Sequence, residues 1–282
     1  MSDLTIRLFG YPRLEVNGEN VPIRRRKALA LLSYLATTRT SHSRGTLAAL
    51  LWPEHEPSRA FAFLRNALWI LNGTPLSEWL VASRHTIGLR EASDLSVDVA
   101  EFRRAISFRS DTEQEDCVRQ LAHAVELFQH DFLAGFSIED SEPFEDWQYS
   151  ESNALRHELG TALDRLALVH ERRGDRQEAV RFVRRWLEIE PLNEAVHRRL
   201  MKLHAEAGQR AEALARYEAC HDTLKRELGL APSEETVALA ESIRCRDQTV
   251  EPPPPKRPPL NLPAYRTSFV GRDEELARAV SL

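Results

Sequence analysis

Two stretches of the chain repeat at a spacing of 34 residues, and this repeat constrains the fold more than any other feature. Gly-Asp-Arg-Gln-Glu-Ala at 174–179 matches Gly-Gln-Arg-Ala-Glu-Ala at 208–213 in four of six positions. This period and layout are typical of tetratricopeptide repeats, which are pairs of antiparallel helices. The Gly and the Ala that begin and end each stretch are expected to let the paired helices pack closely. The rear half of the chain is therefore predicted to be helical throughout.

The front of the chain shows a different pattern, of short strands followed by three helices. Alternation at 4–9 and 13–16, with Asn17-Gly18 as a tight turn before 21–23, predicts a small antiparallel sheet. Helical spacing then predicts a helix of about four turns with an apolar stripe over 28–35, a short helix that ends at Trp52-Pro53, and a third helix from near 57–58 to about residue 71. Residues 79–89 are predicted to be a hairpin with a basic tip. This order predicts a winged helix-turn-helix domain, α+β and OmpR-like. The predicted fold class is therefore mostly α, with an all-α tetratricopeptide-like domain after the winged helix.

Length and charge indicate more than one domain. The chain has 282 residues, which favours two domains. Residues 1–106 carry 14 Lys and Arg against 10 Asp and Glu, whereas residues 107–282 carry 24 against 33, which indicates different partners for each part. The predicted division is a DNA-binding domain at 1–96, a helical domain at 97–248, a Pro-rich linker at 249–264 and a short final piece at 265–282.

Several classes of protein are excluded by the sequence. The longest nearly apolar run, Ala28–Ala36, is too short to span a bilayer, and the N-terminus has no secretory signal pattern. Three cysteines without C-x-x-C spacing favour a reducing cytosol, so a cytoplasmic protein is expected. His170 and His204 share one repeat position and are predicted to pack there, and the acidic group at 139–146 has no catalytic partner. We therefore expect that the protein binds no metal and no cofactor and that it is not an enzyme.

Five stretches of the sequence are similar to one family of regulators. They are LAALLWP at 47–53, LRNAL at 64–68, DVAEF at 98–102, DFLAGF at 131–136 with Trp147, and ELGLAPSEET at 227–236. Together, over about residues 4–248, they resemble the Streptomyces antibiotic regulatory protein (SARP) type of transcriptional activator. The resemblance implies a winged helix, a bacterial transcriptional activator domain and recruitment of RNA polymerase. FVGRDEEL at 269–276 is similar to the entry into the STAND-type nucleotide-binding domain of larger members, so the final piece is predicted to begin such a domain, without the phosphate loop G-x-x-x-x-G-K-[ST].

The third predicted helix carries the first candidate DNA-binding surface. On a helical wheel, Phe61, Leu64, Leu68 and Leu71 form the core face. The opposite face is expected to carry Arg59, Ala62, Phe63, Asn66 and Trp69, with Arg65 nearer the core edge. Arg pairs with guanine and Asn with adenine, so Arg59 and Asn66 are predicted to read bases and Arg65 to contact phosphate. The alternatives are an ordinary solvated face and, for Phe63 and Trp69, contact with the wing or another domain.

Polar residues outside that helix complete the predicted surface. They are Arg24, Arg25, Arg26 and Lys27 at the opening of the first helix, Ser43 and Arg44 at the start of the second, and Arg84 and His85 at the hairpin tip. Cations are unfavourable at a helix N-terminus, and DNA phosphates would offset that cost. The hairpin tip is predicted to touch the DNA backbone or the minor groove, and the second helix to touch phosphate. The alternative for the basic residues is a solubilising surface.

The sequence therefore predicts a transcriptional regulator that binds double-stranded promoter DNA as a pair of protomers. The resemblance implies that it activates transcription. The repeat domain would serve dimerisation, contacts between domains or contacts with RNA polymerase. The alternative is a tetratricopeptide interaction module whose winged helix does not bind DNA. That alternative is favoured by the last turn of the third helix, where Trp69, Ile70 and Leu71 leave few polar groups for hydrogen bonds.

Overall fold

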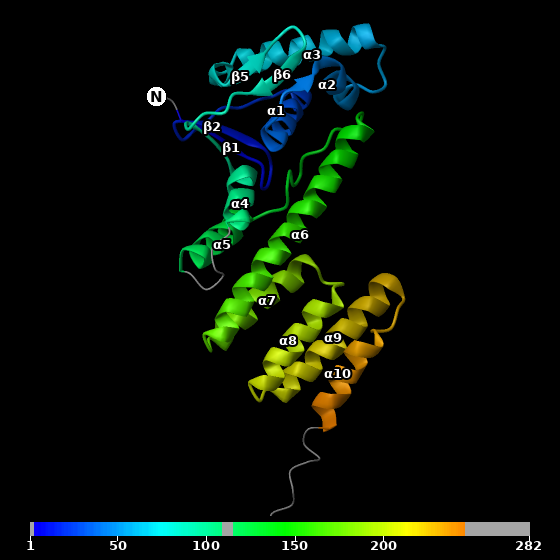
Figure 1. The fold of residues 1–282 in the computed structure, drawn as a ribbon. Helices are drawn as coiled ribbons and strands as arrows, with labels where there is room; N and C mark the ends of the chain where they lie inside the picture. Colours follow the sequence, from blue (N-terminus) through cyan, green and yellow to red (C-terminus); the bar gives the residue numbers. More distant parts are fainter. Residues whose placement is uncertain (1–2, 109–114, 246–282) are drawn as a thin grey trace, which may run out of the picture. The chain divides into compact units, whose positions relative to one another are not determined.

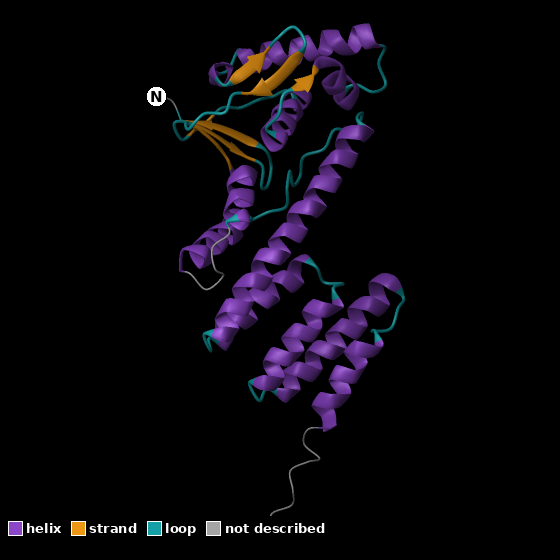
Figure 2. Ribbon diagram, viewed as in Figure 1, coloured by secondary structure: helices purple, strands orange, loops and turns teal. Residues whose placement is uncertain are grey.

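The first sheet joins the start of the chain to a strand that follows the winged helix. The computed structural model describes residues 3–108 and 115–245, and within them this sheet has the order β3-β2-β1-β7 (Figures 1 and 2). The strands are β1 (Leu4–Arg7), β2 (Arg13–Val16), β3 (Glu19–Asn20) and β7 (Leu95–Val97). β1 pairs antiparallel with β2 and parallel with β7, so the predicted domain boundary between residues 96 and 97 falls inside β7.

The hairpin predicted at Asn17-Gly18 is confirmed. Both residues have positive φ, 51° and 81°, as a tight turn of this kind requires. The strand after the turn lies at Glu19–Asn20 and not at 21–23 as predicted. The chain therefore re-enters the sheet directly after the turn.

Three helices and a second sheet form a winged helix-turn-helix, as predicted. The helices are α1 (Arg26–Thr38), α2 (Arg44–Leu51) and α3 (Pro57–Asn72), and a 3-10 turn follows at Pro75–Glu78. The second sheet has the order β4-β6-β5, from β4 (His42–Ser43), β5 (Leu80–Ala82) and β6 (Thr86–Leu89). Leu31, Leu35, Leu47, Leu51 and Leu64 have no exposed surface and form the core under α3.

The rest of the described chain is helical, as predicted. The helices are α4 (Asp98–Ser107), α5 (Glu115–Leu127), α6 (Glu142–Arg172), α7 (Arg176–Ile189), α8 (Glu194–Glu206), α9 (Arg210–Leu228) and α10 (Glu234–Cys245). The end of α6 pairs with α7, and α8 pairs with α9, which gives the two tetratricopeptide-like units (Figure 1). The predicted linker and final piece lie outside the described residues.

The glycines of the repeat form the turns between the helices and do not contribute to the close packing that the sequence predicted. Gly174 and Gly208 have φ of 78° and 74°, and a Cβ added at either would meet nothing within 4 Å. They are therefore needed for the left-handed turn between the two helices, and the prediction that they permit close packing was wrong. Ala179 and Ala213 are fully buried, so close packing rests on the alanines.

The segment between α5 and α6 ties the activator helices to the winged helix. Phe132 forms a β-bridge with Phe9, and the Leu133 amide donates to the Leu8 carbonyl at 2.8 Å. The Ser141 hydroxyl donates to the Leu50 carbonyl at 2.6 Å, at the start of α6. One hydrophobic core consequently extends from β1 through the winged helix into α6.

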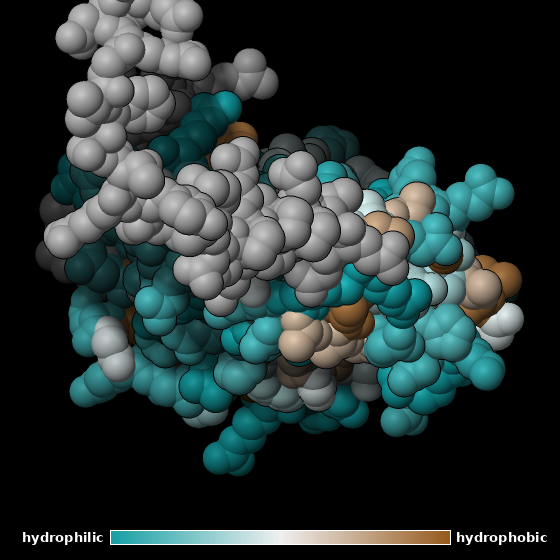
Figure 3. Space-filling view, turned by 90° about the horizontal axis from the view of Figure 1, so that it is seen from below, coloured by the Kyte–Doolittle hydropathy of each residue, from teal (hydrophilic) through white to brown (hydrophobic). Residues whose placement is uncertain are grey.

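Large apolar side chains are exposed at scattered places on this fold. Figure 3 shows a face that is mostly hydrophilic in its described part, with hydrophobic residues in small patches. The exposed large side chains are Tyr11, Trp69, Val81, Phe108, Tyr149, Leu192, Leu228 and Leu230. Single exposed apolar residues are common on soluble surfaces, but Trp69 lies on the helix predicted to enter DNA.

Candidate nucleic-acid interface

Helix α3 separates a core face from an outer face along its whole length. Pro57 occupies its first turn, where a missing amide hydrogen costs nothing. The buried residues are Ala60, Leu64, Ala67, Leu68 and Leu71. The predicted core face is therefore confirmed for the leucines, whereas Phe61 is only half-buried. Phe61 lies at the edge of the apolar stripe, where Ala60 takes the inner position.

The outer face of α3 is open to solvent. Arg59, Ala62, Arg65 and Asn66 are exposed, and Trp69 retains 75% of its surface. That exposure contradicts the alternative in which Trp69 contacts the wing or another domain. The face therefore presents two guanidinium groups, one amide and one indole ring to solvent.

Phe63 lies at the margin of this face. Its ring is 6.1 Å from that of Trp52 and 5.1 Å from that of His55, both in the segment that leads into α3. The Arg59 guanidinium lies over the Phe63 ring, 5.5 Å from its centre. This cation–π contact holds Arg59 against the helix and limits its rotamers.

The hairpin tip is a tight turn that presents two basic residues. Arg84 and His85 are exposed between β5 and β6, and the Ser83 amide donates to the Thr86 carbonyl at 2.8 Å. The Ser83 hydroxyl oxygen accepts from the amides of His85 and Thr86 at 3.1 and 2.9 Å. The turn is thus fixed by its own serine while both basic side chains remain available.

Ser43 and Arg44 connect this turn to α2. The Ser43 oxygen accepts from the Thr46 amide at 3.0 Å and caps the helix. The Arg44 Nε and Nη2 atoms donate to the Ser83 carbonyl at 3.0 and 2.8 Å. Arg44 therefore holds the wing in place while Ser43 caps α2, and their predicted contact with phosphate stays a prediction.

The basic stretch 24–27 is divided by the start of α1. The helix begins at Arg26, so Arg24 and Arg25 precede it, which corrects the prediction that all four cations open the helix. Arg26 lies over the Phe136 ring, 5.9 Å from its centre. Lys27 forms an ion pair with Asp140, which belongs to the segment before α6. Arg24 and Arg25 are exposed and are therefore the members of the stretch most available to an external anion.

The first sheet is held to α4 by a buried carboxylate at Asp98. Its Oδ2 accepts from the amides of Leu8 and Phe9 at 2.8 and 3.0 Å, and its Oδ1 accepts from the Val99 amide at 2.8 Å. Burial raises the pKa of Asp98, although the three amides oppose that shift. Asp98 therefore fixes the strand to which the winged helix is attached.

The two repeat histidines serve the turns between helices. The His170 Nδ1 lies 3.4 Å from the Asp175 carboxylate, and the His204 Nδ1 lies 2.8 Å from the Gln209 amide oxygen. Each histidine thus reaches five positions along the chain, to the residue that precedes the next helix. Within ranges 3–108 and 115–245, no group of three or more His, Cys, Asp or Glu residues is placed to hold a metal.

Three features of this region were missed by sequence reasoning. Asp98 and Asp140 act on residues far away in the sequence, so no local pattern marks them. The arginines of α7 are different, because their close spacing in RQEAVRFVRRW at 176–186 is visible in the sequence.

No helix in the described part of the chain has the length and apolar character needed to cross a membrane.

The described chain has a winged helix followed by paired repeat helices, and the outer face of its third helix is exposed. Residues 93–244 match the sequence model of the bacterial transcriptional activator domain. This match covers more than half of the chain, so the chain belongs to the bacterial transcriptional activator domain family, which is that of SARP-type regulators.

A solved structure shares the fold. The protein is similar to Mycobacterium tuberculosis EmbR, solved in complex with a low-affinity phosphopeptide, with a TM-score of 0.67 and 21% sequence identity. The alignment covers 86% of this chain and 65% of the EmbR chain, so this chain spans about two thirds of that protein's length. No curated protein matches the sequence.

Proposed function

We propose that this protein is a transcriptional activator that binds duplex promoter DNA with the outer face of α3 and the hairpin tip. The observation that carries the proposal is the solvent exposure of Arg59, Ala62, Arg65, Asn66 and Trp69 along one side of α3. A recognition helix needs such a face because the major groove admits one helix and its side chains must reach base edges.

The exposed residues divide into those that read bases and those that bind the backbone. Asn66 suits adenine and Arg59 suits guanine, whereas Ala62 and Trp69 offer apolar contact to thymine methyl groups. Arg65 at the edge of the face is suited to phosphate. The remaining phosphate contacts come from Arg24 and Arg25 before α1, from Ser43 and Arg44, from Arg26 and Lys27, and from Arg84 and His85 at the tip.

The helices after the winged helix then have a second role in the same proposal. Membership of the activator-domain family supports a role of the repeat domain at 97–248 in dimerisation on DNA or in contact with RNA polymerase. In this proposal the DNA-binding domain comprises residues 1–96. The likeness of 269–276 to the entry of a nucleotide-binding domain supports a place in a larger cytoplasmic regulator.

The test starts with selection of binding sites from a random duplex library, followed by anisotropy titrations at several salt concentrations. Affinity should fall steeply with salt, and Arg65→Ala should make the salt slope shallower by about one. Asn66→Ala should relax sequence preference, at a cost of about 1–3 kcal/mol on the selected site. Arg104→Ala, at an exposed arginine of α4, is the matched control.

Two outcomes would argue against the proposal. One is the absence of affinity for any duplex at low salt. The other is equal loss of affinity in Arg65→Ala and Arg104→Ala, because the effect would then reflect only net charge. The first result favours the interaction module whose winged helix does not bind DNA, and the second would show that α3 is not the DNA-binding surface.

A further inference from the structure

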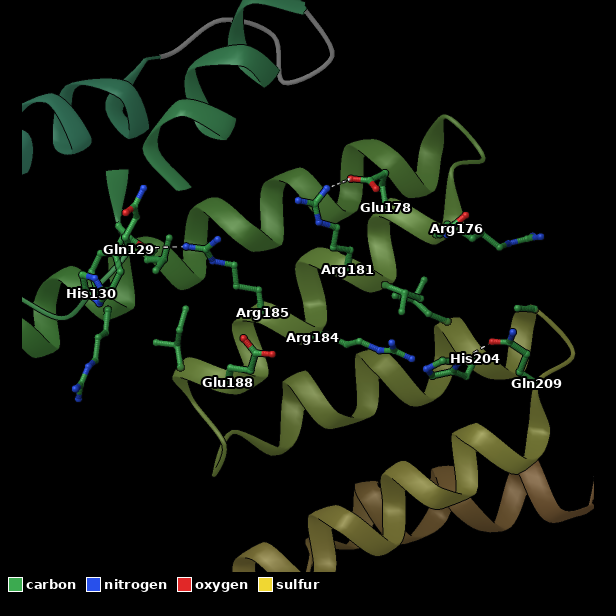
Figure 4. A pocket seen from close by; sticks show the side chains of 18 of the residues that line it. Gln129, His130, Arg176, Glu178, Arg181, Arg184, Arg185, Glu188, His204 and Gln209 are labelled. Atoms are coloured by element: carbon green, nitrogen blue, oxygen red, sulfur yellow. Dashed lines mark hydrogen bonds and ion pairs between the residues drawn. The ribbon is translucent and has the colours of Figure 1, made fainter. Parts of the chain in front are cut away.

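We propose that a groove along α7 binds an acidic peptide segment of a partner protein. The groove has a volume of about 1370 Å³ and is lined by α7, by the segment after α5, by α6 and by α8 (Figure 4). We call it the α7 groove. The proposal goes beyond DNA binding and does not depend on it, since none of the lining residues belongs to the winged helix.

The lining of the α7 groove is basic. It contains five arginines against three carboxylates, and the carboxylates of Asp131 and Glu178 are already paired. Asp131 accepts from Arg156 at 2.6 Å, and Glu178 accepts from Arg181 at 3.2 Å. The paired carboxylates therefore cannot neutralise the other arginines of the groove, which leaves an excess of positive charge for an anionic ligand.

The excess positive charge comes from Arg176 and Arg184 on α7, whereas Arg185 has main-chain partners. Arg185 donates to the main-chain carbonyls of Val125 and Phe128 at 3.0 and 2.7 Å and is thereby fixed in the wall. Arg176 and Arg184 are exposed, and neither guanidinium group has a hydrogen bond or ion pair to another residue of the described chain. Guanidinium groups form paired hydrogen bonds with carboxylates, so these two side chains suit Asp and Glu.

A buried histidine gives an independent indication of a ligand. His204 is only 3% exposed and lines the groove, and Arg184 extends toward it in Figure 4. Its Nδ1 is engaged by Gln209, whereas its buried Nε2 has no partner within the described residues. A buried polar atom without a partner costs free energy, and a ligand carboxylate can meet it when both ring nitrogens carry protons.

The size and apolar lining of the groove favour a peptide. Its volume exceeds the range of about 300–1,000 Å³ that is usual for small-molecule sites. Val180, Ile189 and Leu203 also line it, between the charged groups. A chain with carboxylates separated by apolar side chains therefore matches both the charge and the surface.

The experiment uses the full chain and a fluorescein-labelled peptide in which Glu alternates with Ala and Leu. The same peptide with Gln in place of Glu tests the charge. We expect the Glu peptide to bind to the wild type. The affinity of the double variant Arg176→Gln/Arg184→Gln for this peptide should be lower by about tenfold or more. His204→Gln should also weaken binding, and Arg104→Gln should leave it unchanged.

Binding that is equal for the Glu and Gln peptides, or unaffected by the double variant, would overturn the proposal. Loss of duplex DNA affinity in the double variant would also overturn it, because the groove would then be a nucleic-acid surface. The DNA titration of the double variant should otherwise match that of the wild type. Failure of peptide binding with intact DNA binding would reject the groove alone, and the reverse would reject the DNA-binding proposal alone.

Discussion

The Lys27 ammonium on α1 lies 2.7 Å from a carboxylate oxygen of Asp140 and 5.4 Å from the centre of the Trp52 ring. Its side chain is only 17% exposed, so the pair is partly shielded from water. Arg25 and Arg26 line the same groove as Asp140, on the side of α1. A carboxylate from the segment before α6 therefore occupies a position beside the basic stretch that a DNA phosphate would otherwise favour.

We predict that Asp140→Asn raises affinity for duplex DNA at low salt. Removal of one exposed carboxylate frees Lys27 and is expected to be worth about 0.2–1 kcal/mol, and the gain should shrink as salt rises. Anisotropy titration at two salt concentrations measures it. Asp146→Asn on the exposed side of α6 changes the net charge equally, so the same gain in both variants would contradict a specific role for the Lys27 pair.

The buried carboxylate of Asp98 leads to a prediction about stability. Asp98→Ala leaves the amides of Leu8, Phe9 and Val99 without their acceptor, and each buried orphan costs about 1–3 kcal/mol. We expect a loss of several kcal/mol in the free energy of unfolding by urea, and a smaller loss in Asp98→Asn, which keeps one oxygen. Asp116→Ala, at an exposed carboxylate, should change little; equal losses in the two alanine variants would show that the amides do not depend on Asp98.

The order of strands, helices and hairpin was predictable because each element has its own short-range pattern. Leu64, Leu68 and Leu71 mark the core face of α3 through helical spacing alone. Asn17-Gly18 marks the turn between β2 and β3 through its preference for positive φ. β7 could not be predicted in this way, because three residues carry no periodicity and its partner β1 lies at the start of the chain.

The outer face of α3 was predicted more completely than the rest of the candidate site. Arg59 and Asn66 are exposed as the helical wheel indicates. The wheel does not include the chain that precedes the helix, so the packing of Phe63 against Trp52 was missed. The ion pair of Lys27 with Asp140 was missed for a similar reason, since the carboxylate comes from a segment more remote in the sequence.

Helices α6 and α7 pack so closely at Gly160 that a side chain at this position would clash with α7. A Cβ added there would lie 2.6 Å from Nε1 of Trp186, whose ring is itself held by a hydrogen bond to Glu190. We expect Gly160→Ala to lower the free energy of unfolding by about 1–3 kcal/mol, because the ring must shift. Gly45→Ala is the matched control: its Cβ would be 3.7 Å from Ser43 Oγ, at an exposed position of α2.

Alanine at the control position favours helix by about 0.5–1 kcal/mol over glycine. The two substitutions should therefore shift the urea midpoint in opposite directions. A stabilised Gly160→Ala would mean that α7 moves away from α6 without cost, in conflict with the tight packing at Trp186.

The last prediction concerns the dependence of stability on pH at His197. The side chain is 4% exposed, its Nε2 lies 3.0 Å from the Pro191 carbonyl, and burial lowers its pKa. A histidine with a lowered pKa binds its proton less readily in the folded state than in the unfolded state. Stability should therefore fall as pH drops below about 6.5, by up to about 1.4 kcal/mol per pH unit.

His197→Gln removes this titration and can keep a donor toward Pro191. Urea unfolding between about pH 7.5 and pH 5 should then show a shallower slope in the variant than in the wild type. Burial also lowers the pKa of His42, so part of the slope should remain, and Asp98, with its raised pKa, contributes the opposite slope equally to both proteins. His157→Gln, at an exposed histidine of α6, should leave the slope unchanged. Identical slopes for wild type and His197→Gln would show that His197 binds its proton equally well folded and unfolded, against the effect expected from its burial.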